Sequence, residues 1–114
     1  MMPDRTYEAW KLYNTDRWRK MRQSKLMETP LCEVCSSRGL IVLADSVHHI
    51  NEILNGENEL EMQSIAYDYN NLLSICSTCH NRYHRLVQHG AKAKDDIEFL
   101  EAYNKAVKER KNKE

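Results

Sequence analysis

The sequence predicts an α+β fold in which two short strands and a following helix carry two groups of metal ligands, with further helices on either side. Three observations support this. Cys32 and Cys35, and later Cys76 and Cys79, form two pairs with C-x2-C spacing. Short apolar runs at residues 47–50 and 72–75 are typical of strands. His80 and His84 are four residues apart, so on a helix they share one face and can approach one ion.

The size and composition are those of one small globular domain. The chain has 114 residues, of which 41% are hydrophobic and 30% are charged. A core of this size is modest, so a bound metal would add useful stability. No apolar run is long enough to cross a membrane, and the first residues lack the apolar core of a signal peptide. We therefore expect a cytoplasmic protein.

The four cysteines predict a structural zinc site. In a reducing cytosol, paired cysteines are more often metal ligands than disulfides, although a disulfide framework would be the alternative in a secreted protein. Tetrahedral zinc needs four soft ligands, and two C-x2-C turns supply them from distant segments. A thioredoxin-like redox role is less favoured, because no β-α-β pattern surrounds either pair. The predicted zinc ligands are Cys32, Cys35, Cys76 and Cys79.

The N-terminal part of the chain predicts a basic helical segment. Residues 1–14 are expected to be irregular or to form a short helix. A helix should begin at Thr15 or Asp16 and run to about Met27, before Pro30. Trp18 is expected to pack against the core. The stretch from 17 to 25 contains five basic residues and no acidic one, namely Arg17, Arg19, Lys20, Arg22 and Lys25.

The central part predicts a knuckle followed by strands and an acidic loop. Residues 32–35 should form the tight turn. The apolar, β-branched runs at residues 40–43 and 47–50 are both consistent with strands. Asn55-Gly56-Glu57-Asn58 is a turn signal that opens an acidic loop. A short helix near residues 60–65 is a weaker expectation.

The C-terminal part predicts a return strand and two helices. Residues 72–75 should pair antiparallel with residues 47–50. A helix should run from Cys79 to about His89 and end at Gly90. A last helix is expected from Asp95 or Asp96 to about Lys108, with residues 109–114 fraying. The predicted order is therefore strand, loop, strand, helix.

Charge is segregated along a chain whose formal net charge is zero. No Lys or Arg occurs from residue 40 to residue 79, whereas the segments before and after it are basic. This distribution allows a basic face on a neutral molecule, and such a face can bind nucleic acid. Ordinary solvated helix faces are the alternative explanation.

The histidine spacing resembles a known nuclease signature. His48 and His49, Asn71, and then His80 and His84 resemble the signature of the HNH (ββα-metal, or His-Me finger) nucleases. The C-x2-C pairs resemble the zinc-containing, largely phage and bacterial branch of that superfamily. The resemblance implies a nuclease core at residues 31–90. Residues 1–30 and 91–114 would then be flanking helical segments of the same single domain.

The resemblance also implies roles for the individual side chains. His49 would be the general base and His48 a metal ligand. Neighbouring side chains in a strand point to opposite sides, so this division of roles is physically sensible. His80 and His84 would complete the site of a catalytic ion. Asn71 would tie the loop that carries His49 to the return strand, because an amide both donates and accepts hydrogen bonds.

The implied activity is metal-dependent hydrolysis of DNA, by nicking or by double-strand cleavage. The structural ion would be Zn²⁺, and the catalytic ion Mg²⁺, Mn²⁺, Ni²⁺ or Zn²⁺. Double-stranded DNA would be the partner, and an association with phage terminase subunits is suggested by the family, in a bacterial or phage-infected cell. A zinc-stabilised module without activity and a ribonuclease are the alternatives. The expected DNA contacts are Arg17, Arg19, Lys20, Arg22, Lys25, Arg82 and Arg85.

Overall fold

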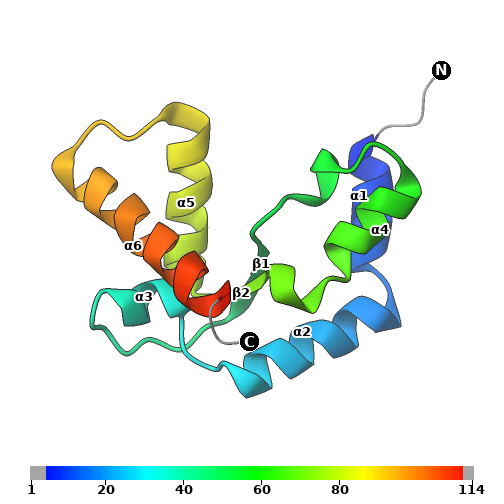
Figure 1. Ribbon diagram of the computed structural model, residues 1–114, viewed down its shortest axis with the longest axis horizontal. Coiled ribbons are helices and arrows are strands. Elements are labelled where there is room, and N and C mark those ends of the chain that lie inside the picture. The colour runs from blue at the N-terminus through cyan, green and yellow to red at the C-terminus, as the bar shows by residue number, and fades with distance from the viewer. Residues whose placement is uncertain (1–4, 112–114) are drawn as a thin grey trace.

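Two short strands lie at the centre of the computed structural model, between two groups of helices (Figure 1). The structure describes residues 5–111. None of its helices is long and apolar enough to cross a membrane. The elements in chain order are α1 (Arg5–Tyr13), α2 (Asp16–Glu28), α3 (Glu33–Ser37), β1 (Ser46–His49), η1 (Ile53–Asn55), α4 (Glu59–Ala66), η2 (Tyr69–Asn71), β2 (Leu72–Ile75), α5 (Ser77–His89) and α6 (Lys94–Lys111).

The strands form the predicted antiparallel pair. His48 lies opposite Leu73 and His49 opposite Leu72. All four residues of β2 are buried, because helices cover both sides of this small sheet. A shift in the pairing register of β1 and β2 would expose apolar side chains, so the register is fixed. The positions of His48 and His49 are therefore fixed as well.

The prediction of a strand at residues 40–43 is wrong. This segment makes one isolated bridge, between Leu31 and Leu43, and otherwise forms a loop. Its apolar side chains point into solvent, and Ile41 is 86% exposed. A strand needs a partner along its length, and only residues 30–32 run beside this segment, so high β-propensity does not make it a strand.

Helix α2 follows the prediction closely. Its N-cap is Thr15, whose Oγ1 accepts a hydrogen bond from the Trp18 amide at 3.1 Å. Trp18 is buried and packs with Val47 and Leu72, so it anchors α2 to both strands. Helix α1 buries Ala9 and Leu12 in a separate small core, whose other members come from η1 and α4.

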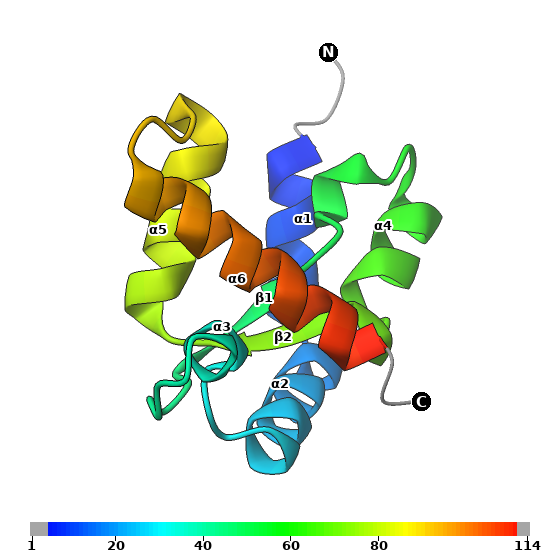
Figure 2. The same ribbon diagram turned by 60° about the vertical axis from the view of Figure 1, so that its left-hand side comes forward.

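The last two helices cover the cysteine side of the sheet, and α6 crosses in front of the strands in Figure 2. Helix α5 begins at Ser77, two residues before the predicted start, and ends at Gly90, where φ is +86°. Helix α6 continues to Lys111, so the expectation that fraying begins at residue 109 is wrong for residues 109–111. The Lys105–Glu109 pair at 3.9 Å supports these last turns. Residues 112–114 lie outside the described part.

Candidate active site and metal centres

The four cysteines come together from two segments, one that precedes β1 and one that follows β2. Cys32 caps α3, and its sulfur accepts a hydrogen bond from the Cys35 amide at 3.4 Å. Cys76 caps α5, and Cys79 lies in the first turn of that helix. All four side chains are buried, and their sulfur atoms lie within 4.8 Å of one another.

The spacing of the sulfur atoms fits tetrahedral zinc. Zinc–sulfur bonds of about 2.3 Å in a tetrahedron place the sulfur atoms roughly 3.8 Å apart. The sulfur of Cys35 lies 3.9 Å from that of Cys76 and 3.6 Å from that of Cys79. None of the four forms a disulfide. Burial raises the pKa of the Cys35 thiol to about 11, so four thiolates here would need a bound cation to neutralise them. The set offers four sulfur ligands and leaves no open position for chemistry.

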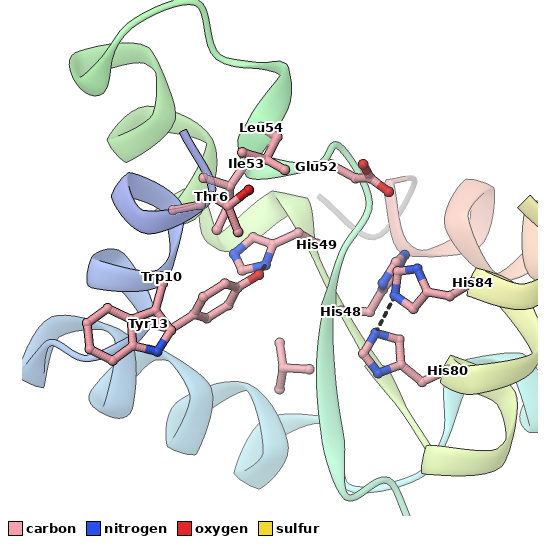
Figure 3. Close-up of a pocket in the computed structure, with 12 residues that line it drawn as sticks. Thr6, Trp10, Tyr13, His48, His49, Glu52, Ile53, Leu54, His80 and His84 are labelled. Carbon is pink, nitrogen blue, oxygen red and sulfur yellow. Dashed lines mark hydrogen bonds between the residues drawn. The ribbon is translucent and has the colours of Figure 1, made fainter. Parts of the chain in front are cut away.

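Three histidines form a second cluster. His48 comes from β1, while His80 and His84 lie one helical turn apart on α5, and one ring nitrogen from each lies within 4.8 Å of the others. The Nε2 atoms of His80 and His84 are 3.0 Å apart. Figure 3 shows the three imidazoles facing one another beside the strand. Three imidazoles on one side leave positions for water and a phosphate oxygen, the arrangement of an open catalytic metal site.

His48 is held in the neutral form that binds metal. Burial, followed by the neighbouring His80 and His84, lowers the pKa of His48 to about 3. Its Nε2 lies 2.8 Å from the hydroxyl of Tyr103 on α6, which fixes the orientation of the ring. Burial also lowers the pKa of His80. Neutral imidazoles keep lone pairs available, so His48 and His80 can bind a divalent ion without protons competing for their ring nitrogens near neutral pH.

His49 lies on the other side of β1 and has a different environment. Its ring stacks on Trp18, with centroids 4.8 Å apart. Its Nε2 lies 3.0 Å from the carbonyl oxygen of Ala66 on α4. Because a carbonyl oxygen only accepts, Nε2 carries the proton and Nδ1 keeps its lone pair. Burial lowers the pKa of His49, so the ring is neutral near pH 7 and can accept a proton at Nδ1.

The second ring nitrogen of His49, Nδ1, lies next to a tyrosine hydroxyl. The Tyr13 hydroxyl lies 3.3 Å from Nδ1, and the two rings meet edge to face. Tyr13 in turn lies edge-on to Trp18. A water molecule can therefore reach Nδ1 only by taking the place of the Tyr13 hydroxyl.

The Asn71 side chain ties three segments together. Its Oδ1 accepts a hydrogen bond from the Asn51 amide at 2.7 Å. Its Nδ2 donates to the carbonyls of Asn51 and Ile65, at 2.9 and 3.2 Å. Asn51 lies two residues after His49, and Ile65 directly precedes Ala66. The Asn71 side chain therefore holds two segments in place. One is the end of β1, which carries His49, and the other is the end of α4, where the Ala66 carbonyl accepts the hydrogen bond from Nε2 of His49.

The three clustered histidines and His49 line one cleft. Its volume is about 540 Å³, and α1 forms its opposite wall. In Figure 3, Trp10 and Tyr13 rise from α1 across from His80 and His84, with His48 beside these two and His49 between the groups. The full lining is Thr6, Ala9, Trp10, Tyr13, Val47, His48, His49, Glu52, Ile53, Leu54, His80 and His84. His49 and the cluster of His48, His80 and His84 thus share one space that is open to a ligand.

Two of the seven cations expected to contact DNA are engaged inside the fold. The Lys25 side chain is 6% exposed, and its ammonium pairs with Glu33 at 3.2 Å. The Arg82 guanidinium pairs with Asp95 and Asp96 and lies over the Phe99 ring. These two side chains hold helices together in this structure.

The other five predicted cations reach the surface. Lys20 and Arg85 are exposed. Arg19 pairs with Asp16, and Arg22 donates to the carbonyl oxygen of Asp45 at 2.9 Å. Arg17 lies over the Tyr67 ring, 4.4 Å from its centroid. Exposed pairs of this kind are weak, so these guanidinium groups can exchange their partners for phosphate.

Sequence reasoning missed three groups that act on the histidines. These are the hydroxyl of Tyr13, the hydroxyl of Tyr103 and the carbonyl oxygen of Ala66. In the sequence, Tyr103 is recognisable only as a member of the apolar stripe of the last helix, and nothing links it to the histidines. A backbone carbonyl has no sequence signal at all, so Ala66 could not have been found.

Residues 32–86 match the family model of the HNH endonucleases. These residues form an HNH domain. The HNH domain spans both metal-ligand clusters, β1, β2 and most of α5. A crystal structure of an HNH endonuclease from the deep-sea thermophilic bacteriophage GVE2, with a manganese ion, is similar to this chain. The TM-score is 0.58 and the identity 26%, over 79% of this chain and 100% of the phage chain. Among curated proteins, no significant match was found.

Proposed function

We propose that this HNH domain makes the chain a metal-dependent endonuclease that hydrolyses phosphodiester bonds of DNA. The observation that carries the proposal is the pairing of two sites in one cleft. The Nε2 of His49 is hydrogen-bonded to the Ala66 carbonyl, and its Nδ1, which faces the Tyr13 hydroxyl, keeps the lone pair that can accept a proton. Beside it, one ring nitrogen from each of His48, His80 and His84 lies within 4.8 Å of the others. Activated water and a bound cation are what phosphodiester hydrolysis requires.

The proposed chemistry assigns each side chain one task. His48, His80 and His84 would hold Mg²⁺, Mn²⁺, Ni²⁺ or Zn²⁺, which when bound would stabilise negative charge on the phosphoryl and departing oxygens. His49 takes a proton from the attacking water at Nδ1. The Ala66 carbonyl then stabilises the imidazolium through the Nε2 proton, and the Asn71 hydrogen bonds keep both partners in place.

Substrate contact is proposed for the exposed cations of α2 and α5. Arg17, Arg19, Lys20 and Arg22 lie on or beside one helix, and Arg85 lies on the helix that carries two ligand histidines. Such contacts position a phosphate backbone without reading its sequence, so weak sequence preference follows. We also propose that the enzyme is phage-encoded, which the similarity to a phage endonuclease supports. Action in the cytoplasm of an infected cell, beside terminase subunits, is part of the same proposal.

Plasmid cleavage tests the proposal. Wild-type protein incubated with supercoiled DNA and Mg²⁺, Mn²⁺ or Ni²⁺ should produce nicked or linear DNA, and parallel reactions with RNA test the ribonuclease alternative. His49→Ala should lower the rate by about 100-fold to 10,000-fold, because general-base catalysis is of that size. Manganese binding, measured by calorimetry, should be retained.

His89→Ala is the matched control. His89 is exposed at the end of α5 and belongs to neither cluster, so its substitution should leave cleavage unchanged. Full cleavage by His49→Ala would refute the general-base assignment. A folded wild-type protein that cuts neither polymer with any of the metals would instead favour a zinc-stabilised binding module without activity.

A further inference from the structure

The wall of the cleft formed by α1 carries exposed aromatic rings. Tyr7, Trp10 and Tyr13 recur every three residues along one side of the helix, while Ala9 and Leu12 are buried on another. Trp10 lines the cleft and is 57% exposed. Tyr7 stacks against it, with ring centroids 5.9 Å apart and an interplanar angle of 20°. A group of large apolar rings exposed beside a cleft is typical of a surface that binds another molecule.

The aromatic wall is fixed in position relative to the histidines. The Arg5 guanidinium donates to the carbonyl oxygens of Leu54, at 3.0 Å, and of Gly56. These contacts tie the start of α1 to the segment that forms the rim of the cleft. At the other end of the helix, Tyr13 contacts both Trp18 and His49. The Trp10 ring is therefore held on a helix whose two ends are both anchored.

Among the described residues, those that α1 contributes to the cleft lining offer no positive charge to a phosphate group. The residues that α1 contributes to the cleft are uncharged, and they are Thr6, Ala9, Trp10 and Tyr13. The ammonium of Lys11 pairs with Glu8 at 3.0 Å and lies over the Tyr7 ring. Glu52 adds a negative charge to the cleft lining. An anionic backbone is thus disfavoured along α1, whereas the flat, uncharged face of a nucleobase fits an exposed indole.

We propose that Trp10 is a stacking platform for an unpaired nucleobase next to the phosphate that is cut, an inference that rests on the proposed nuclease function. Bases inside a duplex have both faces covered by their neighbours. Only an unpaired or displaced base can present a free face to Trp10. The preferred substrate is therefore DNA that is single-stranded, gapped or mismatched beside the cleavage point, with the paired side held by the cations of α2.

Binding to matched oligonucleotides tests the platform. Fluorescence anisotropy in a His49→Ala background, where cleavage does not interfere, compares a duplex with the same sequence carrying a central unpaired bubble. Trp10→Ala should raise Kd for the bubble about 5-fold to 100-fold, the range that loss of one stacked base implies, and change Kd for the duplex by less than twofold. Trp10→Phe should restore most of the bubble affinity, because an aromatic face is kept.

Intrinsic fluorescence supplies a second measurement. Trp10 is exposed and Trp18 is 7% exposed, so quenching on addition of single-stranded DNA should come from Trp10 and vanish in Trp10→Phe. Leu60→Ala, which removes another exposed apolar side chain away from the cleft, is the control and should behave like wild type. Equal losses on bubble and duplex, or no loss on either, would overturn the platform.

The outcomes separate the platform from the nuclease proposal. If wild-type protein cuts plasmid DNA and Trp10→Ala shows no bubble-specific loss, only the platform fails. If wild-type protein cuts no nucleic acid, the nuclease proposal fails, and the binding comparison still decides whether Trp10 stacks a base. Self-association that depends on Trp10, with unchanged DNA affinity, would show that the ring packs against a second copy and would also overturn the platform.

Discussion

At the residue scale, two adjacent histidines of β1 have different surroundings because a strand alternates its faces. His48 turns toward α5 and α6 and meets His80, His84 and Tyr103. His49 turns toward α1, α2 and α4, where Trp18 and the Ala66 carbonyl fix its ring. The proposed ligand and the proposed base therefore stay within one cleft without competing for the same partners.

The Tyr103 hydroxyl is the contact at this scale that is easiest to test. It lies 2.8 Å from Nε2 of His48, and such partners of a ligand histidine orient the ring and set which nitrogen bears the proton. Tyr103→Phe should lower manganese affinity about 10-fold to 100-fold, measured by titration calorimetry. Tyr69→Phe, which loses a hydrogen bond to Glu28 on the surface, should leave manganese affinity unchanged. Wild-type affinity in Tyr103→Phe would show that the hydroxyl does not orient His48.

At the element scale, Glu33 joins α2 to the cysteine knuckle and to β2. Its carboxylate pairs with the buried Lys25 ammonium and accepts a hydrogen bond from the Ser74 amide at 2.7 Å. The sequence predicts α2, β1, β2 and α5 from caps, propensity and glycine placement, since these are local signals. The loop at residues 40–43 has an equally strong local signal and forms no strand, because pairing depends on which other segment lies alongside.

Lys25→Met tests the junction between α2 and the knuckle. Removing one member of a buried ion pair leaves the other charge without compensation, so the free energy of unfolding should fall by about 3 kcal/mol. Urea denaturation of the zinc-bound protein measures the change. Lys20→Met on the exposed side of the same helix should change stability by less than about 0.5 kcal/mol. Equal stabilities for the two variants would mean that the buried pair adds nothing to the junction.

At the scale of the whole molecule, α5 belongs to both metal-ligand clusters. Its first turn carries Cys79, its next residue is His80, and His84 follows one turn later. The spacing along α5 is readable from the sequence, and so are the ligand types. The partners His48 and Cys35 come from distant segments, and only the packed fold shows that they meet those of α5. The contacts of Tyr13, Ala66 and Tyr103 with the histidines also depend on that packing. No sequence pattern predicts these contacts.

Cys76→Ser tests whether the sulfur cluster supports the histidine cluster. A structural zinc adds directly to the folding free energy of a small domain. We expect loss of zinc, a fall in stability of about 3 kcal/mol or more, and a fall in Tm of roughly 10 °C. Manganese affinity should fall as well, because α5 loses its anchor. Thr78→Ala, an exposed change within the same turn, should keep zinc and Tm. A zinc-free Cys76→Ser protein with wild-type Tm would contradict the structural role.

The proposed mechanism requires that imidazoles from β1 and α5 bind one divalent ion beside His49. Anomalous diffraction from crystals soaked in Mn²⁺ measures this directly. We expect a manganese peak within bonding distance of His48, His80 and His84, and a separate zinc peak among the four cysteines. Manganese bound elsewhere, with these three imidazoles free of metal, would contradict it.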